Sequence, residues 1–238
     1  MDFKSLSTPA LILDRAVVTQ NTSRMAKKMS AHGIALRPHL KTAKSARVAK
    51  LATSGHSGGI TVSTLAEAAY FLEHGFADIT YAVCIVPSKL KQAAALIKGG
   101  ADLKLLTDSA DSARAIGESD LGVTFKVLIE IDSGDARTGL LPDDISLLEI
   151  GKIIDGGQSS ELAGVLTHGG HSYSAEDVDE IKRIAEDERG SVVEAAARLR
   201  QASLPCPTVS AGSTPTAVHG ENYDGLTEMR PGVFVFFD

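Results

Sequence analysis

Short apolar runs alternate with amphipathic segments along almost the whole chain. Eight runs rich in isoleucine, valine and leucine are typical of buried strands, and most precede a segment with helical spacing. We expect these strands at residues 34–37, 59–62, 79–83, 103–107, 123–131, 162–166, 208–210 and 226–230. A further short strand is expected at residues 8–14, before a helix over residues 15–31 that Gly33 terminates.

This alternation predicts the fold class. Repeated strand-helix units produce parallel strands joined by right-handed crossovers, and eight such units close most simply into a (β/α)8 barrel. The chain has 238 residues, close to the roughly 250 that such a barrel takes as a single domain. An open doubly wound sheet is the alternative, but no GxGxxG motif follows the first strand.

Two of the predicted helices begin with capping-box patterns, Thr64 with Glu67 and Ser174 with Asp177. The second of these helices runs over residues 175–201 and carries an acidic first half. Carboxylates early in a helix complement its dipole and face water, so we expect a solvated face rather than a metal or partner site. The acidic residues are Glu176, Asp177, Asp179, Glu180, Glu186, Asp187 and Glu188.

Composition narrows the class of protein further. Hydrophobic residues make up 43% and charged residues 23%, which allows a sizeable core, and the net charge of -6 without a basic stripe argues against a nucleic-acid partner. The start of the chain lacks the apolar core of a signal peptide, and no apolar run is long enough for a bilayer. A cytoplasmic protein with no membrane partner is expected. Cys84 and Cys206 are interpreted as two core thiols.

Residues 37–44, Arg-Pro-His-Leu-Lys-Thr-Ala-Lys, follow the first of the eight strands. The carboxyl edge of a parallel sheet is where α/β proteins build active sites, and Lys41 would lie on that edge. A lysine walled by apolar neighbours can lose its proton near neutral pH and attack a carbonyl group, as Schiff-base chemistry requires. On these eight residues alone, the simpler interpretation is that Lys41 and Lys44 are ordinary lysines of a solvated helix turn.

Polar residues also follow the fifth and sixth strands. Arg137 lies in a loop with two nearby glycines, from which it could reach inward, and the alternative is a surface arginine. The segment 167–173 combines His168, His171 and Tyr173 around a glycine pair. A zinc site there lacks a third ligand nearby, so we expect these side chains to line a pocket instead.

Loops rich in serine, threonine and glycine follow the seventh and eighth strands, at residues 210–216 and 230–234. Parallel barrels commonly bind phosphate with the loops after strands seven and eight, through backbone N–H groups. Since both loops occur at the expected positions, the sequence predicts a phosphorylated ligand.

Five spaced motifs together resemble the D-serine dehydratase and D-threonine aldolase family, whose members are fold-type III pyridoxal-phosphate enzymes related to alanine racemase. The resemblance runs from Thr8 to Asp238. The motifs are Thr8-Pro9-Ala10-Leu11, Arg37-Pro38-His39-Leu40-Lys41-Thr42, Val62-Ser63-Thr64-Leu65-Ala66-Glu67-Ala68, Gly212-Ser213-Thr214-Pro215 and Arg230-Pro231-Gly232.

The resemblance implies pyridoxal 5'-phosphate as the cofactor and assigns roles to the residues at the strand ends. Lys41 would be the Schiff-base lysine, and Arg137 would face the pyridine nitrogen. Tyr173 would lie against the cofactor ring with His168 close by, and both would act in catalysis. An arginine cannot accept a proton, so it would keep the ring nitrogen unprotonated and weaken the electron sink. The phosphate would be held by Gly212, Ser213, Thr214, Gly232 and Val233.

The resemblance also implies zinc or another divalent metal in the full-length family, which would help the β-hydroxyl of the substrate to leave. The family's ligands lie in a carboxyl-terminal β-domain, so we expect no metal ligand in this chain and that domain to lie beyond Asp238. The expected domains are an amino-terminal strand at residues 1–13, which would pair with the β-domain, and the barrel at 14–238. A homodimer is implied for the full-length family.

The resemblance leaves three functions open. The first is a lyase that converts a D-configured β-hydroxy amino acid, such as D-serine, to a 2-oxo acid and ammonia. The second uses the same site as an aldolase, releasing glycine and an aldehyde. The third is a single-barrel protein that only carries pyridoxal phosphate. The motifs around Lys41 and Gly212 favour the enzymes, and the segment 170–173 favours the dehydratase slightly.

Overall fold

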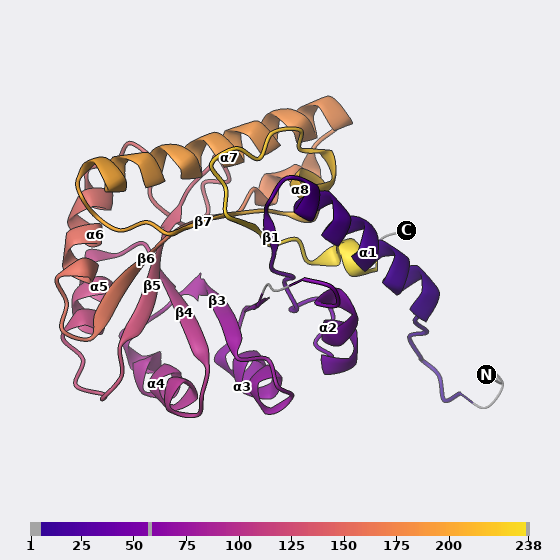
Figure 1. The fold of residues 1–238 in the computed structure, drawn as a ribbon, viewed down its shortest axis with the longest axis horizontal. Helices are drawn as coiled ribbons and strands as arrows, with labels where there is room; N and C mark the ends of the chain where they lie inside the picture. The colour runs from indigo at the N-terminus through magenta and orange to yellow at the C-terminus, as the bar shows by residue number, and fades with distance from the viewer. Residues whose placement is uncertain (1–5, 57–58, 237–238) are drawn as a thin grey trace.

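The computed structural model describes residues 6–56 and 59–236 as a parallel β-barrel surrounded by helices (Figure 1). All eight strands predicted from the apolar runs are confirmed, with ends shifted by a few residues. The strands are β1 (Ala35–Leu36), β2 (Ile60–Val62), β3 (Asp78–Cys84), β4 (Asp102–Thr107), β5 (Phe125–Ile131), β6 (Ser160–Thr167), β7 (Thr208–Ala211) and β8 (Glu228–Met229).

The strands form one sheet in the order β1-β8-β7-β6-β5-β4-β3-β2, and every neighbouring pair is parallel. The two ends of this sheet meet beyond β1, where His39 forms a parallel bridge with Thr61. There the Thr61 N–H group donates to the Pro38 carbonyl and the Leu40 N–H group donates to the Thr61 carbonyl, both at 2.9 Å. These bonds close the sheet, so the predicted (β/α)8 barrel is confirmed over the open alternative.

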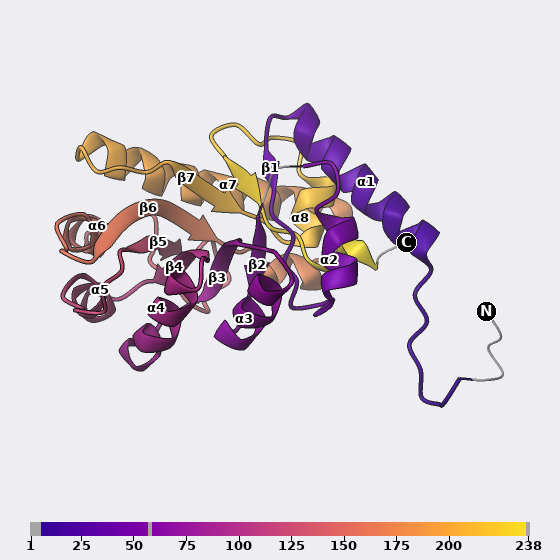
Figure 2. The same cartoon turned by 60° about the horizontal axis from the view of Figure 1, so that its bottom comes forward.

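The helices lie outside the strands, as Figures 1 and 2 show for α3 to α7. Short 3-10 turns in the described part of the chain lie at residues 87–89 (η2), 170–174 (η3) and 233–235 (η4). The helices are α1 (Arg15–Ala31), α2 (Ala46–Ala52), α3 (Leu65–Glu73), α4 (Leu90–Lys98), α5 (Ala110–Gly117), α6 (Ser146–Asp155), α7 (Val178–Gln201) and α8 (Thr214–His219).

The strands bury both faces, which is why they appear in the sequence as nearly continuous apolar runs. Successive side chains point to opposite faces of a strand. Thus Leu105 and Val127 belong to the large core beneath the helices, whereas Leu106 and Leu128 belong to a separate, smaller cluster. The smaller cluster fills the barrel interior, so the barrel is a packed support for its loops rather than a pore.

The strand expected at residues 8–14 is not formed in this structure, and its pairing with a domain beyond Asp238 stays a prediction. Residues 6–14 form no strand, and Figures 1 and 2 show the segment leaving the amino end of α1 and running away from the barrel. Leu11 is fully exposed, and Ile12 and Leu13 are largely exposed as well. A single extended segment with no sheet edge beside it has no partner for its backbone groups. Residues 1–5 of the expected amino-terminal strand lie outside the described residues.

Of the two expected helix caps, Thr64 is confirmed and Ser174 is wrong. The Thr64 hydroxyl does cap α3, accepting from the Glu67 N–H group at 3.0 Å. The predicted capping box of Ser174 is wrong, because α7 begins later, with Asp177 as its cap accepting from the Glu180 N–H group at 2.8 Å. Residues 170–174 form a 3-10 turn instead.

The sequence analysis expected the whole acidic run of α7 to face water, and this is wrong for Glu188. Glu186 and Asp187 are exposed, but Glu188 is buried, with 1% of its surface accessible. A helix turns about 100° per residue, so neighbouring positions face different surroundings.

Within the described residues, no helix is both long enough and apolar enough to cross a membrane.

Candidate active site

The loops that follow β1, β5, β6, β7 and β8 meet at the carboxyl edge of the barrel and enclose a small pocket. It brings together four of the residues predicted for the site: Lys41, Arg137, His168 and Gly212. Because strands far apart in the sequence supply these residues, only the closed barrel makes them neighbours. The pocket is also lined by His39, Ala82, Glu130, Leu166 and Arg230.

Lys41 stands on a turn that the backbone holds firmly. The His39 N–H group donates to the Pro231 carbonyl at 2.9 Å, which ties this turn to the loop after β8. Burial, followed by the positive charges of Arg137 and Arg230, lowers the pKa of Lys41, with Glu67 opposing. A lowered pKa leaves more of the lysine as the free amine, which is the form that attacks a carbonyl group.

His168 is held in one tautomer by the loop after β7. Its Nδ1 lies 3.1 Å from the Gly212 carbonyl oxygen, which can only accept, so Nδ1 carries the proton and Nε2 keeps its lone pair. Burial, followed by the charges of Arg230, Lys41 and Arg137, lowers the pKa of His168 to about 4, against the bond to Gly212. The ring is therefore neutral at pH 7 and can accept a proton at Nε2.

Arg137 borders the pocket at the end of a loop that is itself anchored. The guanidinium is more than half exposed and lies 3.8 Å from the Asp135 carboxylate. The Thr138 hydroxyl next to it donates to Glu130 at 2.9 Å, and the Gly139 N–H group donates to Asp108 at 3.0 Å. These two carboxylates fix the loop and leave the arginine free to meet a ligand.

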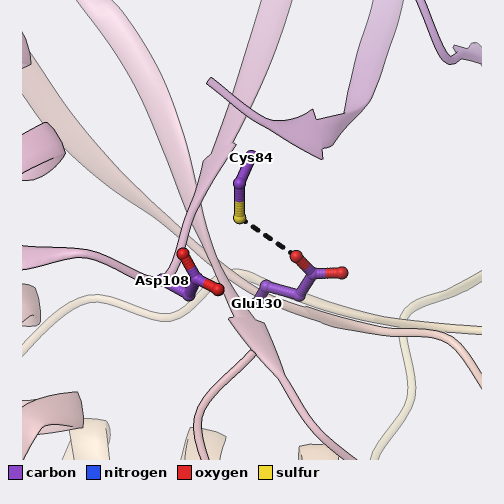
Figure 3. Close-up of side chains that lie close together, drawn as sticks. All are labelled: Cys84, Asp108 and Glu130. Carbon is purple, nitrogen blue, oxygen red and sulfur yellow. Dashed lines mark hydrogen bonds between the residues drawn. The ribbon is translucent and has the colours of Figure 1, made fainter. Parts of the chain in front are cut away.

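Cys84, Asp108 and Glu130 gather where β3, β4 and β5 end (Figure 3). Within residues 6–56 and 59–236, they are the one group that offers three metal-binding atoms within 4.8 Å of one another. The Cys84 thiol donates to Glu130 at 3.0 Å, and burial followed by the Glu130 charge raises its pKa. The group is thus linked internally by a protonated thiol. Cys84 is not the core thiol expected from the sequence, whereas Cys206 is buried.

The two loops predicted to hold phosphate are bonded to each other. The Thr214 hydroxyl accepts from the Gly232 and Phe234 N–H groups, each at 3.2 Å. A side chain at position 232 would bring its Cβ 3.1 Å from the His39 carbonyl oxygen, so glycine lets this loop pack against the lysine turn. The residues predicted for the phosphate site lie in these two loops, and Val233 alone among them is not fully buried. They are Gly212, Ser213, Thr214, Gly232 and Val233.

Tyr173 is placed at the edge of these two loops, not deep within the lysine pocket. Its hydroxyl accepts from the Thr214 N–H group at 3.2 Å, and half of the side chain is exposed. Tyr173, Thr214 and Phe234 line a neighbouring groove that α1 borders. The N–H group of Thr214 that the sequence assigns to phosphate therefore donates to Tyr173 in this structure.

His171 does not line the lysine pocket and lies beside Asp135 instead. Its Nδ1 lies 3.9 Å from the Asp135 carboxylate. Within the part of the chain that the structure describes, His168 and His171 belong to no group of three metal-binding atoms.

The sequence interpretation missed three charged residues of the site. Arg230 is 4% exposed and donates to the Ser210 hydroxyl and to the Thr167 and Ala211 carbonyls. Glu130 lines the pocket, and Glu188 lies behind it. For Arg230 and Glu130 the available signal was a charged residue within or just after an apolar run, since a buried charge needs partners. Glu188 stands in an acidic run and gave no such signal.

A parallel eight-stranded barrel with a lysine of lowered pKa after its first strand defines the class of alanine racemase-like barrels. The family model described as alanine racemase, N-terminal domain, matches residues 13–238, and the chain belongs to this family. Among characterised relatives, the D-threo-3-hydroxyaspartate dehydratase of Delftia sp. (strain HT23) is 47% identical over 98% of this chain and 62% of its own. The structure of that dehydratase matches with a TM-score of 0.94.

More distant relatives confirm the resemblance found in the motifs. The D-serine dehydratase of Dictyostelium discoideum is 29% identical over 100% of this chain and 64% of its own. The D-threonine aldolase of Arthrobacter sp. is 28% identical over 98% of this chain and 62% of its own. The chain thus spans less than two thirds of the length of these relatives.

Proposed function

We propose that this barrel is the cofactor-binding part of a pyridoxal-phosphate-dependent lyase that acts on D-configured β-hydroxy amino acids. The reaction gives a 2-oxo acid and ammonia, as in D-serine dehydratase. The single observation that carries this proposal is the pocket that joins Lys41, Arg137 and His168 from three separate loops. The names of the relatives support a dehydratase, the nearer of them acting on D-threo-3-hydroxyaspartate.

The residues present fit pyridoxal phosphate. A lysine with a lowered pKa lies beside Arg137 and Arg230, so the pocket attracts an anionic ligand that carries an aldehyde. Glycine also lets the backbone pack closely at two places in the loops predicted to hold phosphate. A Cβ at Gly212 would lie 2.7 Å from the backbone nitrogen of Arg230, and one at Gly232 would lie 3.1 Å from the His39 carbonyl oxygen. The two glycines therefore bring the loops after β7 and β8 together beside the lysine turn.

When bound, pyridoxal phosphate supplies the aldehyde that takes the substrate's amino group and the ring that withdraws electrons from Cα. Lys41 would hold the aldehyde between turnovers and, once released as the amine, take the proton from Cα. Neutral His168 offers Nε2 as a second proton acceptor. Arg137 would face the ring nitrogen, and Tyr173 would lie against the ring, with Gly212, Ser213, Thr214, Gly232 and Val233 at the phosphate.

The resemblance implies a divalent metal whose ligands would lie beyond Asp238, so the residues of this chain would not hold it. The aldolase reaction is the alternative for the same site, because D-threonine aldolase is also among the relatives. It differs in the bond that breaks, Cα–Cβ instead of Cβ–O. The substrate partner is a D-amino acid in either case.

The experiment that tests the proposal compares products. The chain loaded with pyridoxal phosphate is incubated with D-threo-3-hydroxyaspartate, D-serine and D-threonine, with and without zinc. A 2-oxo acid with an equal amount of ammonia supports the dehydratase, and glycine with an aldehyde supports the aldolase. Lys41→Ala should abolish either product, whereas Lys44→Ala, at an exposed lysine on the same turn, should not. Equal and measurable turnover by the parent and Lys41→Ala would contradict the proposal.

A further inference from the structure

Glu188 is a buried carboxyl group directly behind the site. It lies in the middle of α7 and is 1% exposed, although its neighbours Glu186 and Asp187 face water. A buried carboxyl group destabilises a protein unless it is hydrogen-bonded, so its contacts identify what it does.

Glu188 is bonded to both loops that flank the pocket. Its Oε1 accepts from the Gly169 N–H group at 2.5 Å and from the Gly212 N–H group at 3.0 Å. One oxygen atom therefore joins the loop after β6 to the loop after β7.

These bonds determine the setting of His168. Gly169 is the residue next to His168, and Gly212 supplies the carbonyl that accepts from His168 Nδ1 at 3.1 Å. Gly212 has a φ of 125°, a conformation that other residues rarely adopt. Once its N–H group is fixed on Glu188, its carbonyl is directed at the imidazole, which leaves His168 Nε2 as the acceptor in the pocket.

We propose that Glu188 is a positioning residue that fixes both the tautomer of His168 and the start of the predicted phosphate loop at Gly212. The effect of this residue on catalysis rests on the proposed function, whereas its effect on the two loops does not. Glu188 touches no reacting atom and acts through the two loops. Arg230 donates to the Ser210 hydroxyl and to the Thr167 and Ala211 carbonyls, and Glu188 adds a negative charge near this guanidinium.

The two loop bonds need an acceptor oxygen, which does not have to carry a charge. Burial raises the pKa of Glu188, which favours the uncharged form. Glutamine keeps an oxygen at the position of Oε1 and has nearly the same shape, so Glu188→Gln should preserve both loop bonds. Methionine fills similar space without an acceptor, so Glu188→Met leaves two N–H groups unpaired. Aspartate is too short to reach both loops.

The test uses the whole chain and compares Glu188→Gln, Glu188→Met and Glu188→Asp with Glu194→Met, an exposed position on the same helix. Nitrogen-15 NMR of His168 reports the tautomer without cofactor. Fluorescence titration with pyridoxal phosphate reports affinity. The parent, Glu188→Gln and Glu194→Met should show His168 protonated at Nδ1 and the same affinity. Glu188→Met and Glu188→Asp should show mixed tautomers and an affinity about tenfold weaker or more, as expected for a lost buried hydrogen bond.

The result that would overturn the inference is a folded Glu188→Met or Glu188→Asp protein with the parental tautomer and affinity. If Glu188→Met does not fold, the inference is tested with Glu188→Asp and with amide exchange of the parent. Exchange of the Gly169 and Gly212 N–H groups as fast as that of exposed loops would also overturn it. If the parent fails to bind pyridoxal phosphate, the proposed function fails, while tautomer and amide exchange still test Glu188 by themselves.

Discussion

Lys41 shares its pocket with two arginines, and the pKa of its amine depends on both. Removing the charge of Arg137 should raise the pKa of Lys41, because the ammonium form is then repelled less. At any pH below that pKa, Arg137→Gln should therefore capture pyridoxal phosphate more slowly than the parent. The pH at which capture reaches half its maximal rate should move upward, measured by borohydride reduction and mass spectrometry.

The matched control is Arg114→Gln, which changes an exposed arginine paired with Asp111 and Glu149. It removes the same charge from the chain but not from the pocket, so its profile should overlay that of the parent. A profile for Arg137→Gln that also overlays the parent would show that this guanidinium does not act on Lys41.

His168 should remain neutral across the physiological range. Its pKa is lowered to about 4 by burial and by the surrounding cations. In the unfolded chain the pKa of histidine is about 6.5, so the unfolded state binds more protons between the two values. The free energy of unfolding should consequently fall as the pH drops from 6.5 towards 4. NMR of the ring should show no titration above pH 5, and a midpoint near 6.5 would contradict this account.

The two thiols should both be slow to alkylate in the folded chain. Burial raises the pKa of Cys206 to about 11, and burial with the Glu130 charge raises that of Cys84. Since the thiolate is the reactive form, iodoacetamide at pH 8 should modify both at least about tenfold more slowly than in urea. Glu130→Gln should speed alkylation of Cys84 and leave Cys206 unchanged. Mass spectrometry of the two peptides distinguishes these outcomes.

At the scale of elements, the turn from β7 into α8 depends on the backbone of Gly212. Its φ is 125°, and a Cβ at this position would lie only 2.7 Å from the backbone nitrogen of Arg230, so there is no room for a side chain. Gly212→Ala should lower the free energy of unfolding by about 1–3 kcal/mol and weaken binding of pyridoxal phosphate. Urea unfolding and fluorescence titration measure the two effects.

Gly190→Ala provides the control for this substitution. Gly190 lies inside α7, and a Cβ there would meet no atom within 4 Å. Alanine is a better helix former than glycine by roughly 0.5–1 kcal/mol, so this variant should be slightly more stable than the parent. If Gly212→Ala were equally harmless, the tight turn would not be what shapes the loop predicted to hold phosphate.

At the scale of the whole molecule, the eight strands could be predicted because parallel strands covered on both faces are continuously apolar. The loops of the site could be predicted because active sites lie at the carboxyl edge of such sheets. Lys41, Arg137, His168 and Gly212 do meet in one pocket. Their roles towards the cofactor stay predictions, as do those of Tyr173, Ser213, Thr214, Gly232 and Val233.

The sequence could not reveal contacts between residues that only the fold brings together. Glu188 belongs to an acidic run along the chain, and only the packing of α7 against two loops buries it. The thiol of Cys84 meets Glu130 only because β3 and β5 end at the same edge. The strand expected at 8–14 has suitable side chains, but a strand needs a neighbouring edge that local pattern cannot provide.

The central claim is that Lys41 is the lysine that captures pyridoxal phosphate, and one measurement tests it most directly. The chain is incubated with the cofactor at neutral pH, reduced with borohydride, digested, and mapped by mass spectrometry. We expect one stoichiometric label, on the peptide that contains Lys41, and none after Lys41→Ala. A label on Lys44 or another lysine, or an unlabelled chain at cofactor saturation, would contradict the account.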